Sequence, residues 1–147
     1  MRREQVTEKV VVAKHAKGLS WSALAKAAGR SEVWTTSALL GQQAMSLDEA
    51  AACGSLLGLG AEEIALLQVP PSKGSLEAAV STDPLIYRFH EINQVYGTTL
   101  KALIHEKFGD GIMSAIDFEM EIDKVADPKG DRVKVTMSGK FLAYRKW

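Results

Sequence analysis

Two consecutive prolines near the middle of the chain separate stretches with different hydrophobic patterns. The segment "VPPSKG", residues 69–74, cannot continue a helix, because proline lacks the backbone N–H and its ring clashes with the preceding turn. Before this break apolar residues recur at helical spacing, whereas near the end of the chain they alternate with a period of two. We therefore expect an α+β protein, mainly α, with a helical bundle over residues 1–75 and a small α/β domain over residues 76–147.

The stretch before the prolines predicts five helices, with serine caps at their starts and glycine stops at their ends. The expected helices cover residues 5–17, 21–28, 32–43, 47–58 and 61–68. The serine caps are Ser20, Ser31 and Ser46, and the glycine stops are Gly18 and Gly29. The apolar faces expected on the first two helices are Val6, Val10 and Ala13, and Leu24, Ala27 and Ala28.

The stretch after the prolines predicts two helices followed by a hairpin. The helices begin near Pro84 and after Gly97, and the second ends at Gly109. Apolar residues then alternate from Ile116 to Ile122, "DPKGDR" turns the chain, and a strand returns towards a second turn at Gly139 and a short third segment. A hairpin of this size is marginal alone, yet its apolar face is clean. We therefore expect that face to be buried against a partner chain in an obligate oligomer.

The segment "WSALAKAAGRSEVWTTSALL", residues 21–40, has the form of a helix-turn-helix. DNA recognition needs Lys or Arg against the phosphates and polar side chains at base edges. From Ser31 through Ser72 there is no Lys or Arg, and five acidic residues lie in that span: Glu32, Asp48, Glu49, Glu62 and Glu63. A helical bundle that reuses a common packing unit is the favoured interpretation. The basic residues of the first helix leave nucleic-acid binding open as an alternative, although a solvated helix face explains them better.

Bulk properties exclude several other classes of protein. Eighteen Lys and Arg balance eighteen Asp and Glu, which argues against non-specific nucleic-acid binding. Cys53 is the single cysteine, and its small apolar neighbours predict a buried thiol rather than a catalytic one. The first twenty residues lack the apolar core of a signal peptide, and no run approaches membrane-spanning length. We expect a cytoplasmic protein without membrane attachment.

The region after the prolines also holds the candidate chemical groups. Arg88 and Glu91 are three residues apart and therefore neighbours on one helix face, where an ordinary surface ion pair is the simplest interpretation. Ser114 follows "GDGIM" at the start of the strand, where glycines allow a tight turn and N–H groups to point at an anion. The simpler alternative is a serine that bonds its own backbone. His90 and His105 have no third ligand at a usable spacing, so we expect no metal site.

From Asp83 nearly to the chain end, the sequence closely resembles the C-terminal half of the cyanase (cyanate hydratase) family. The matching segments are "YRF", "QVYGTTLKAL", "HEKFGDGI" and "SAI", and "ALLGQQA" in the first half is similar to the family's helical domain. The resemblance implies a repressor-like N-terminal domain that is not used for DNA, and a C-terminal domain whose strands interlock in a dimer. Five such dimers would form a homodecamer.

The resemblance also implies the activity and its residues. Family members convert cyanate and bicarbonate into carbon dioxide and carbamate, which yields ammonia and a second carbon dioxide, without a metal or organic cofactor. Their catalytic arginine, glutamate and serine match Arg88, Glu91 and Ser114, whereas His90 and Ile92 replace a tyrosine and a methionine common in the family. Because both substrates are anions, we expect the site to lie between subunits, where two chains each supply Arg88. A DNA-binding regulator and a cyanase-like scaffold without activity remain as alternatives.

Overall fold

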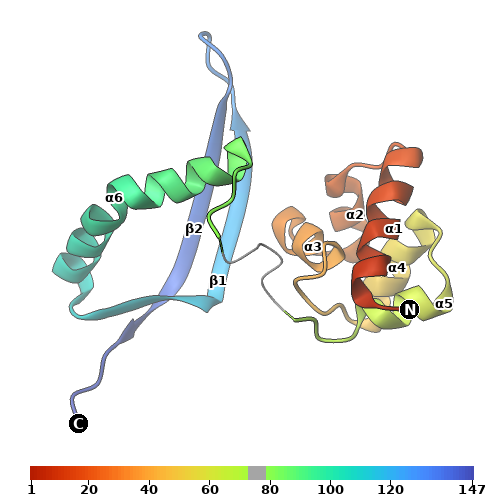
Figure 1. Ribbon diagram of the computed structural model, residues 1–147, viewed down its shortest axis with the longest axis horizontal. Helices are drawn as coiled ribbons and strands as arrows, with labels where there is room; N and C mark the ends of the chain where they lie inside the picture. The colour runs from red at the N-terminus through yellow and green to blue at the C-terminus, as the bar shows by residue number, and fades with distance from the viewer. Residues whose placement is uncertain (73–78) are drawn as a thin grey trace. The chain divides into compact units, whose positions relative to one another are not determined.

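A computed structural model describes residues 1–72 and 79–147 of the chain (Figure 1). In these residues the order of elements is α1 (Arg3–Ala16), α2 (Trp21–Ala28), α3 (Glu32–Leu39), α4 (Leu47–Leu57), α5 (Ala61–Leu67), α6 (Pro84–Phe108), β1 (Gly111–Val125) and β2 (Arg132–Ala143). The chain forms two compact units, one of residues 1–75 with 120–136 and one of residues 76–119 with 137–147. The expected domain boundary after residue 75, and the end of "VPPSKG", lie outside the described residues.

Three helices of the first unit, α2 to α4, begin at the expected serine caps. The side chain of Ser20 accepts a hydrogen bond from the N–H of Ala23 at 3.0 Å, and Ser31 and Ser46 cap α3 and α4 in the same way. Each cap binds one of the N–H groups that the first turn of a helix leaves without a partner. Gly29 ends α2 in the left-handed region at φ 67°, as glycine does most readily. The start and end of α2 are therefore confirmed.

The core of the first unit is small and apolar. Its buried residues are Val6, Val10, Leu24, Ala38, Leu39, Met45, Ala50, Cys53, Leu57 and Leu67. The expected buried thiol is confirmed, and burial raises the pKa of Cys53 to about 11. The prediction for α2 was wrong at Ala27, which is exposed, whereas Ala25 is buried next to Leu24. Alanine fits both faces of a helix, so spacing alone does not place it.

Helix α3 is shorter than expected, because it ends at Leu39 instead of continuing to residue 43. Gly41 follows at φ 86°, a conformation that no helix residue adopts. A Cβ at this glycine would lie only 3.0 Å from Oγ1 of Thr7. The chain therefore turns at a glycine that lies close to the side chain of Thr7 on α1.

The second unit contains one long helix where two were expected. Helix α6 begins at the Asp83 cap, whose side chain accepts hydrogen bonds from the N–H groups of Leu85 and Ile86, each at 3.0 Å. The helix runs for 25 residues to Phe108 and passes through Gly97 without a break. Glycine inside a helix costs about 1 kcal/mol relative to alanine, which weakens a helix but does not end it. Gly109 ends α6 at φ 93°, as expected.

Strands β1 and β2 form an antiparallel pair, and their turn is confirmed at Asp127, which accepts a hydrogen bond from Gly130 N at 3.0 Å. Two details differ from the expectation. Strand β1 begins at Gly111, before the alternating pattern starts, and β2 continues through Gly139 to Ala143 instead of turning there. No third strand follows β2 in the described residues. Gly139 thus lies within a strand, where glycine marks a close approach of backbone.

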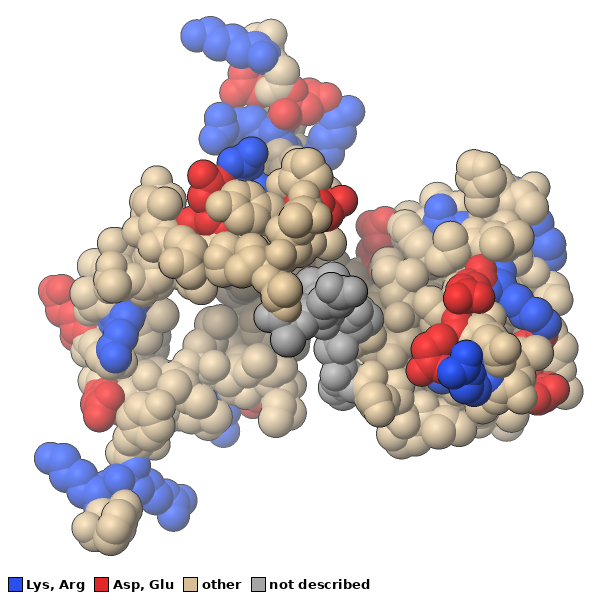
Figure 2. Space-filling model, in the orientation of Figure 1, with Lys and Arg blue, Asp and Glu red and all other residues tan. Residues whose placement is uncertain are grey.

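Much of the second unit's apolar surface is exposed in the single chain. Helix α6 has no buried residue along its described length. Residues 92–100 in its middle include no Lys, Arg, Asp or Glu, whereas charged side chains lie near both of its ends (Figure 2). Leu100 on α6 is 51% exposed, and Ile116 on β1 is 98% exposed. Exposed apolar surface of this extent marks an interaction site in a protein that remains in solution. The burial of this surface by a partner chain stays a prediction.

Candidate functional site

The arginine and the glutamate of the candidate site pair on the second turn of α6. The Asp83 cap and Pro84 at the first helical position fix the start of the helix, and Arg88 is its fifth residue. Nη1 of Arg88 donates to Oε2 of Glu91, which confirms the contact expected from their spacing. The two side chains are 62% and 44% exposed. An exposed pair contributes less than about 1 kcal/mol to stability, so its value for the fold is small.

Ser114 is the one candidate residue that is buried, with 6% of its surface exposed. Its Oγ accepts hydrogen bonds from the N–H groups of Ile116 and Asp117, both at 3.0 Å. The serine therefore does bond its own backbone, as the simpler interpretation expected. This does not make it inert: a hydroxyl has two acceptor positions and one donor hydrogen. With both lone pairs engaged, the group is suited to donate its hydrogen to an anion.

The structure does not bring Ser114 together with the arginine–glutamate pair in one chain. Arg88 lies near the start of α6, and Phe108 at its other end is about 30 Å away at about 1.5 Å per residue. Strand β1 leaves from that far end (Figure 1). No hydrogen bond between Ser114 and either Arg88 or Glu91 occurs among the described residues. Within one chain the structure thus joins Arg88 to Glu91 but joins neither of them to Ser114.

The two histidines lie at different places on α6 and do not meet. The ring of His90 packs against Tyr87, with ring centroids 5.9 Å apart, next to the Arg88–Glu91 pair. His105 lies in the last turn, where its Nε2 is 3.3 Å from the carbonyl oxygen of Gly111. Within the described residues, no three His, Cys, Asp or Glu side chains gather as metal ligands would.

Five cations of the helical unit have partners within that unit. Arg3 donates to the carbonyl oxygen of Ala38 at 2.6 Å, and Lys17 donates to that of Leu56 at 3.0 Å, which places positive charge at the C-terminal ends of α3 and α4. Lys9 pairs with Glu63, Arg30 with Glu49, and Lys14 lies over the ring of Trp21. These side chains are occupied by the fold and are not presented together as a phosphate-binding surface.

The acidic partners of these cations also bind backbone N–H groups. Oε2 of Glu49 accepts from Ser46 N at 2.7 Å, and Arg30 Nε donates to its other oxygen at 2.5 Å. Both bonds favour the charged carboxylate, so they lower the pKa of Glu49, the backbone bond most strongly. The pKa of Glu63 is lowered in the same way, most by the hydrogen bond from Lys9 and next by the hydrogen bond from Gly60 N. These glutamates complete helix caps rather than a catalytic site.

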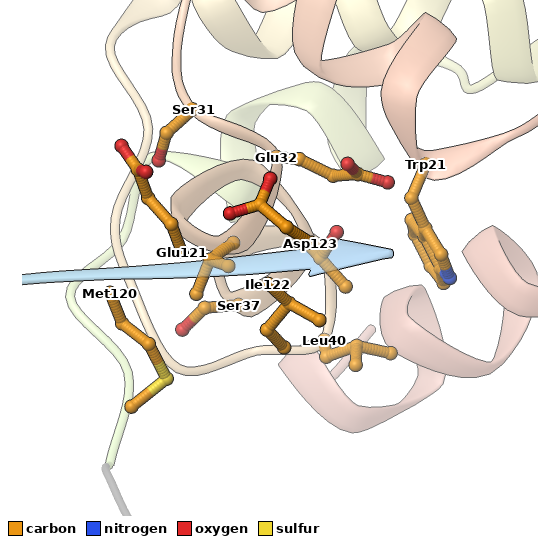
Figure 3. Close-up of a pocket in the computed structure, with 11 residues that line it drawn as sticks. Trp21, Ser31, Glu32, Ser37, Leu40, Met120, Glu121, Ile122 and Asp123 are labelled. Carbon is orange, nitrogen blue, oxygen red and sulfur yellow. The ribbon is translucent and has the colours of Figure 1, made fainter. Parts of the chain in front are cut away.

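The first unit has a hollow lined by α2, α3 and residues 120–123 of β1, all within that unit (Figure 3). Its polar lining includes the carboxylates of Glu32, Glu121 and Asp123. Among the residues that the structure describes, no lysine or arginine lines it. Because like charges repel, this hollow is unsuited to an anionic ligand. It contains none of the three residues that the sequence singled out.

Sequence reasoning missed one residue near the candidate site. Gly139 was expected in a turn, but it lies in β2 directly opposite Ser114. Its φ is not positive, so the strand continues through this glycine without turning. A glycine inside a run of strand-forming residues is the available sign of a close backbone contact.

Comparison with known proteins covers nearly the whole chain. The model of the N-terminal domain of cyanate hydratase matches residues 3–71, and that of the C-terminal domain of cyanate lyase matches residues 78–146. Cyanate hydratases from Ralstonia pickettii and Thiobacillus denitrificans are 61% and 59% identical over 145 residues, which is 99% of this chain and of each relative. The crystal structure of cyanase from T. urticae superposes with a TM-score of 0.80 at 40% identity, covering 94% of this chain and 96% of that one. No helix among the described residues has the length and apolar character to span a membrane.

Proposed function

The chain belongs to the cyanate hydratase family, and on that premise we propose that it catalyses the bicarbonate-dependent decomposition of cyanate. Bicarbonate adds through an oxygen to the cyanate carbon and its proton passes to nitrogen. The dianionic adduct then loses carbon dioxide and takes up one proton to give carbamate. Carbamate takes up another proton and breaks into ammonia and a second carbon dioxide. All atoms come from the two substrates and two protons, so the proposal needs no cofactor.

The main barrier to this reaction is electrostatic, because both substrates are anions. Two unit charges about 4 Å apart repel by about 4 kcal/mol at an effective dielectric of about 20. A guanidinium suits the task, since it stays charged and its planar fork contacts two oxygens at once. One guanidinium balances one of the two negative charges. We propose that two chains each supply Arg88 to one site, so that the adduct's charge is fully balanced.

The observation that carries this proposal is the separation of Ser114 from Arg88 and Glu91 along one chain. The pair projects from the start of α6, largely exposed, and Ser114 follows the far end of that helix. The exposed apolar residues of α6 and β1 provide a surface on which further copies can pack. A homodecamer built from five interlocked dimers, with the site between subunits, accounts for both features. We also propose a domain boundary after residue 75, with a helical domain of residues 1–75 and a catalytic and dimerisation domain of residues 76–147.

Each residue of the proposed site has a distinct role. Arg88 holds the substrate oxygens, and Glu91 orients the guanidinium through the bond that joins them. Ser114 donates its hydroxyl hydrogen to an oxygen whose charge grows as the adduct forms, because its own acceptor positions are already taken. The proton required for carbamate comes from solvent or through Glu91. His90 and Ile92 lie beside the pair and leave these roles intact.

The proposal places the enzyme in the cytoplasm, with cyanate and bicarbonate as partners and no nucleic acid or membrane. The reaction consumes cyanate, a reactive anion, and releases its nitrogen as ammonia. Detoxification of cyanate and recovery of its nitrogen are therefore the roles we propose.

Ammonia release tests the function directly. Purified protein is given cyanate with bicarbonate, and ammonia and carbon dioxide are measured over time. We expect one ammonia and two carbon dioxide per cyanate consumed, and no ammonia above the uncatalysed rate when bicarbonate is removed. An assembled, folded protein that produces no ammonia under either condition would instead be a scaffold without activity. Ammonia release that is independent of bicarbonate would contradict the proposed chemistry.

A further inference from the structure

Strand β2 passes unusually close to the backbone of Ser114. A Cβ placed at Gly139 would lie 2.4 Å from the carbonyl oxygen of Ser114 and 2.6 Å from Cγ of Met113. Real Cβ atoms essentially never approach a heavy atom closer than 3.0 Å. The backbone of Gly139 has no positive φ, so its conformation is open to any residue. Glycine is therefore needed here for space and not for flexibility.

A second glycine marks the same close passage from the other strand. A Cβ at Gly111 would lie 2.3 Å from the carbonyl oxygen of Leu142 and 2.6 Å from Cζ of Phe141. Ser114 thus lies in the part of β1 that is pressed against β2. Two Ser114 hydrogen bonds then fix its hydroxyl relative to that same backbone.

The C-terminal end of β2 makes two further contacts. The ring of Phe141 stacks on that of Phe108 at the end of α6, with centroids 5.2 Å apart. Tyr144 N donates to the carbonyl oxygen of Asp110 at 3.1 Å. These contacts tie β2 to the end of α6 and to the residue before β1, so the two strands cannot simply separate to make room for an added methyl group at Gly139.

We propose that Gly139 is a positioning residue that sets the location of the Ser114 hydroxyl. This inference rests on the proposed function, in which Ser114 donates to the reacting anions. Relief of a 2.4 Å contact to 3.0 Å requires a relative shift of at least about 0.6 Å between the backbone of Gly139 and the backbone that carries Ser114. A misplacement of about 1 Å can lower a rate by about 10²-fold. Gly139 therefore acts on the reaction through Ser114 and without touching substrate.

A double-mutant cycle separates positioning from a general structural role. Gly139→Ala, Ser114→Ala and the double variant are compared with the parent enzyme by kcat, after sedimentation has established the same assembly in each. We expect Gly139→Ala to lower kcat by about 10- to 100-fold. In the Ser114→Ala background the same change should alter kcat less than about twofold, because the group that Gly139 positions is gone. Independent losses that multiply would overturn the proposal.

Two further variants identify the atom through which the effect passes. Ser138→Ala changes the neighbouring exposed residue, which provides a matched control, and should leave kcat unchanged. Met113→Ala removes the side chain that the new methyl would also meet but leaves the Ser114 carbonyl in place. It should therefore fail to rescue Gly139→Ala. Full rescue would assign the effect to Met113 packing and overturn the proposal.

The remaining outcomes are also decisive. If Ser114→Ala is as active as the parent, the proposed role of Ser114 fails and the positioning role fails with it. If Ser114→Ala is impaired but Gly139→Ala is fully active, only the positioning role fails. If neither Gly139→Ala nor Gly111→Ala assembles, the close passage is a requirement of the fold, and the assignment of Gly139 to Ser114 is wrong.

Discussion

We expect Arg88→Lys to lower kcat/KM by about 10²- to 10³-fold without loss of assembly. The substitution keeps a positive charge on α6 but replaces a planar fork by a point charge that cannot bind two oxygens in parallel. Removal of one well-placed donor from a site of developing negative charge commonly costs a factor of this size. The loss of the Arg88–Glu91 bond has little effect on stability, because both side chains are largely exposed in the chain. Steady-state ammonia release gives the rate, and a thermal melt gives the stability.

A matched control is available at the other end of the chain. Arg2 is exposed and lies outside the second unit, so Arg2→Lys makes the same chemical change away from the proposed site. We expect parental kcat/KM for that variant. Near-normal turnover by Arg88→Lys would contradict the proposal that the Arg88 guanidinium groups hold the substrate oxygens, even if cyanate remained the substrate.

We expect Leu100→Glu to abolish assembly and to reduce ammonia release to the background of the assay. Leu100 is 51% exposed on a helix with no buried residue, so a glutamate there costs the isolated chain little, and glutamate is itself a good helix former. In the proposed oligomer the same position is covered by another chain, and an unpaired charge would be buried. Sedimentation measures the assembly, and circular dichroism checks that the helices remain.

The control for this change is Leu47→Glu in the first unit, where the leucine is 61% exposed at the start of α4. The chemical change and the degree of exposure are similar, but Leu47 lies outside the surface assigned to subunit contacts. We expect that variant to assemble and to be active. Equal behaviour of the two variants would show that the exposed face of α6 is not the surface that holds subunits together.

The helical half of the fold could be predicted from sequence because its signals are local. A serine cap such as Ser20 binds an N–H three residues away, and a glycine such as Gly29 needs only its own backbone conformation. The predictions of a helix end at Gly97 and of a turn at Gly139 were wrong, because the role of each glycine depends on more than its local sequence. Gly97 lies inside a helix and Gly139 inside a strand, so neither stops its element. The close contact that explains Gly139 comes from a residue far away in sequence.

The candidate site was predictable in part. The spacing of Arg88 and Glu91 gives their contact, and the resemblance to cyanases selects them together with Ser114. The bonding of Ser114 to Ile116 and Asp117 follows from a short polar side chain near its own backbone. How the three residues come together does not follow from one sequence, because the proposed contact depends on surfaces of separate chains.

Subunit mixing tests most directly whether one site is built from several chains. Arg88→Lys and Ser114→Ala proteins are each dissociated, mixed in equal amounts and reassembled, and ammonia release is compared with that of each variant reassembled alone. If two chains supply Arg88 to a site and a third supplies Ser114, some mixed sites contain only parental residues. Random mixing gives about one eighth of such sites, in which both arginine donors are Ser114→Ala chains and the serine donor is an Arg88→Lys chain. We therefore expect activity well above that of either variant. If both residues of a site came from the same chain, every site would retain a defect, and a mixture no more active than its components would contradict the shared site.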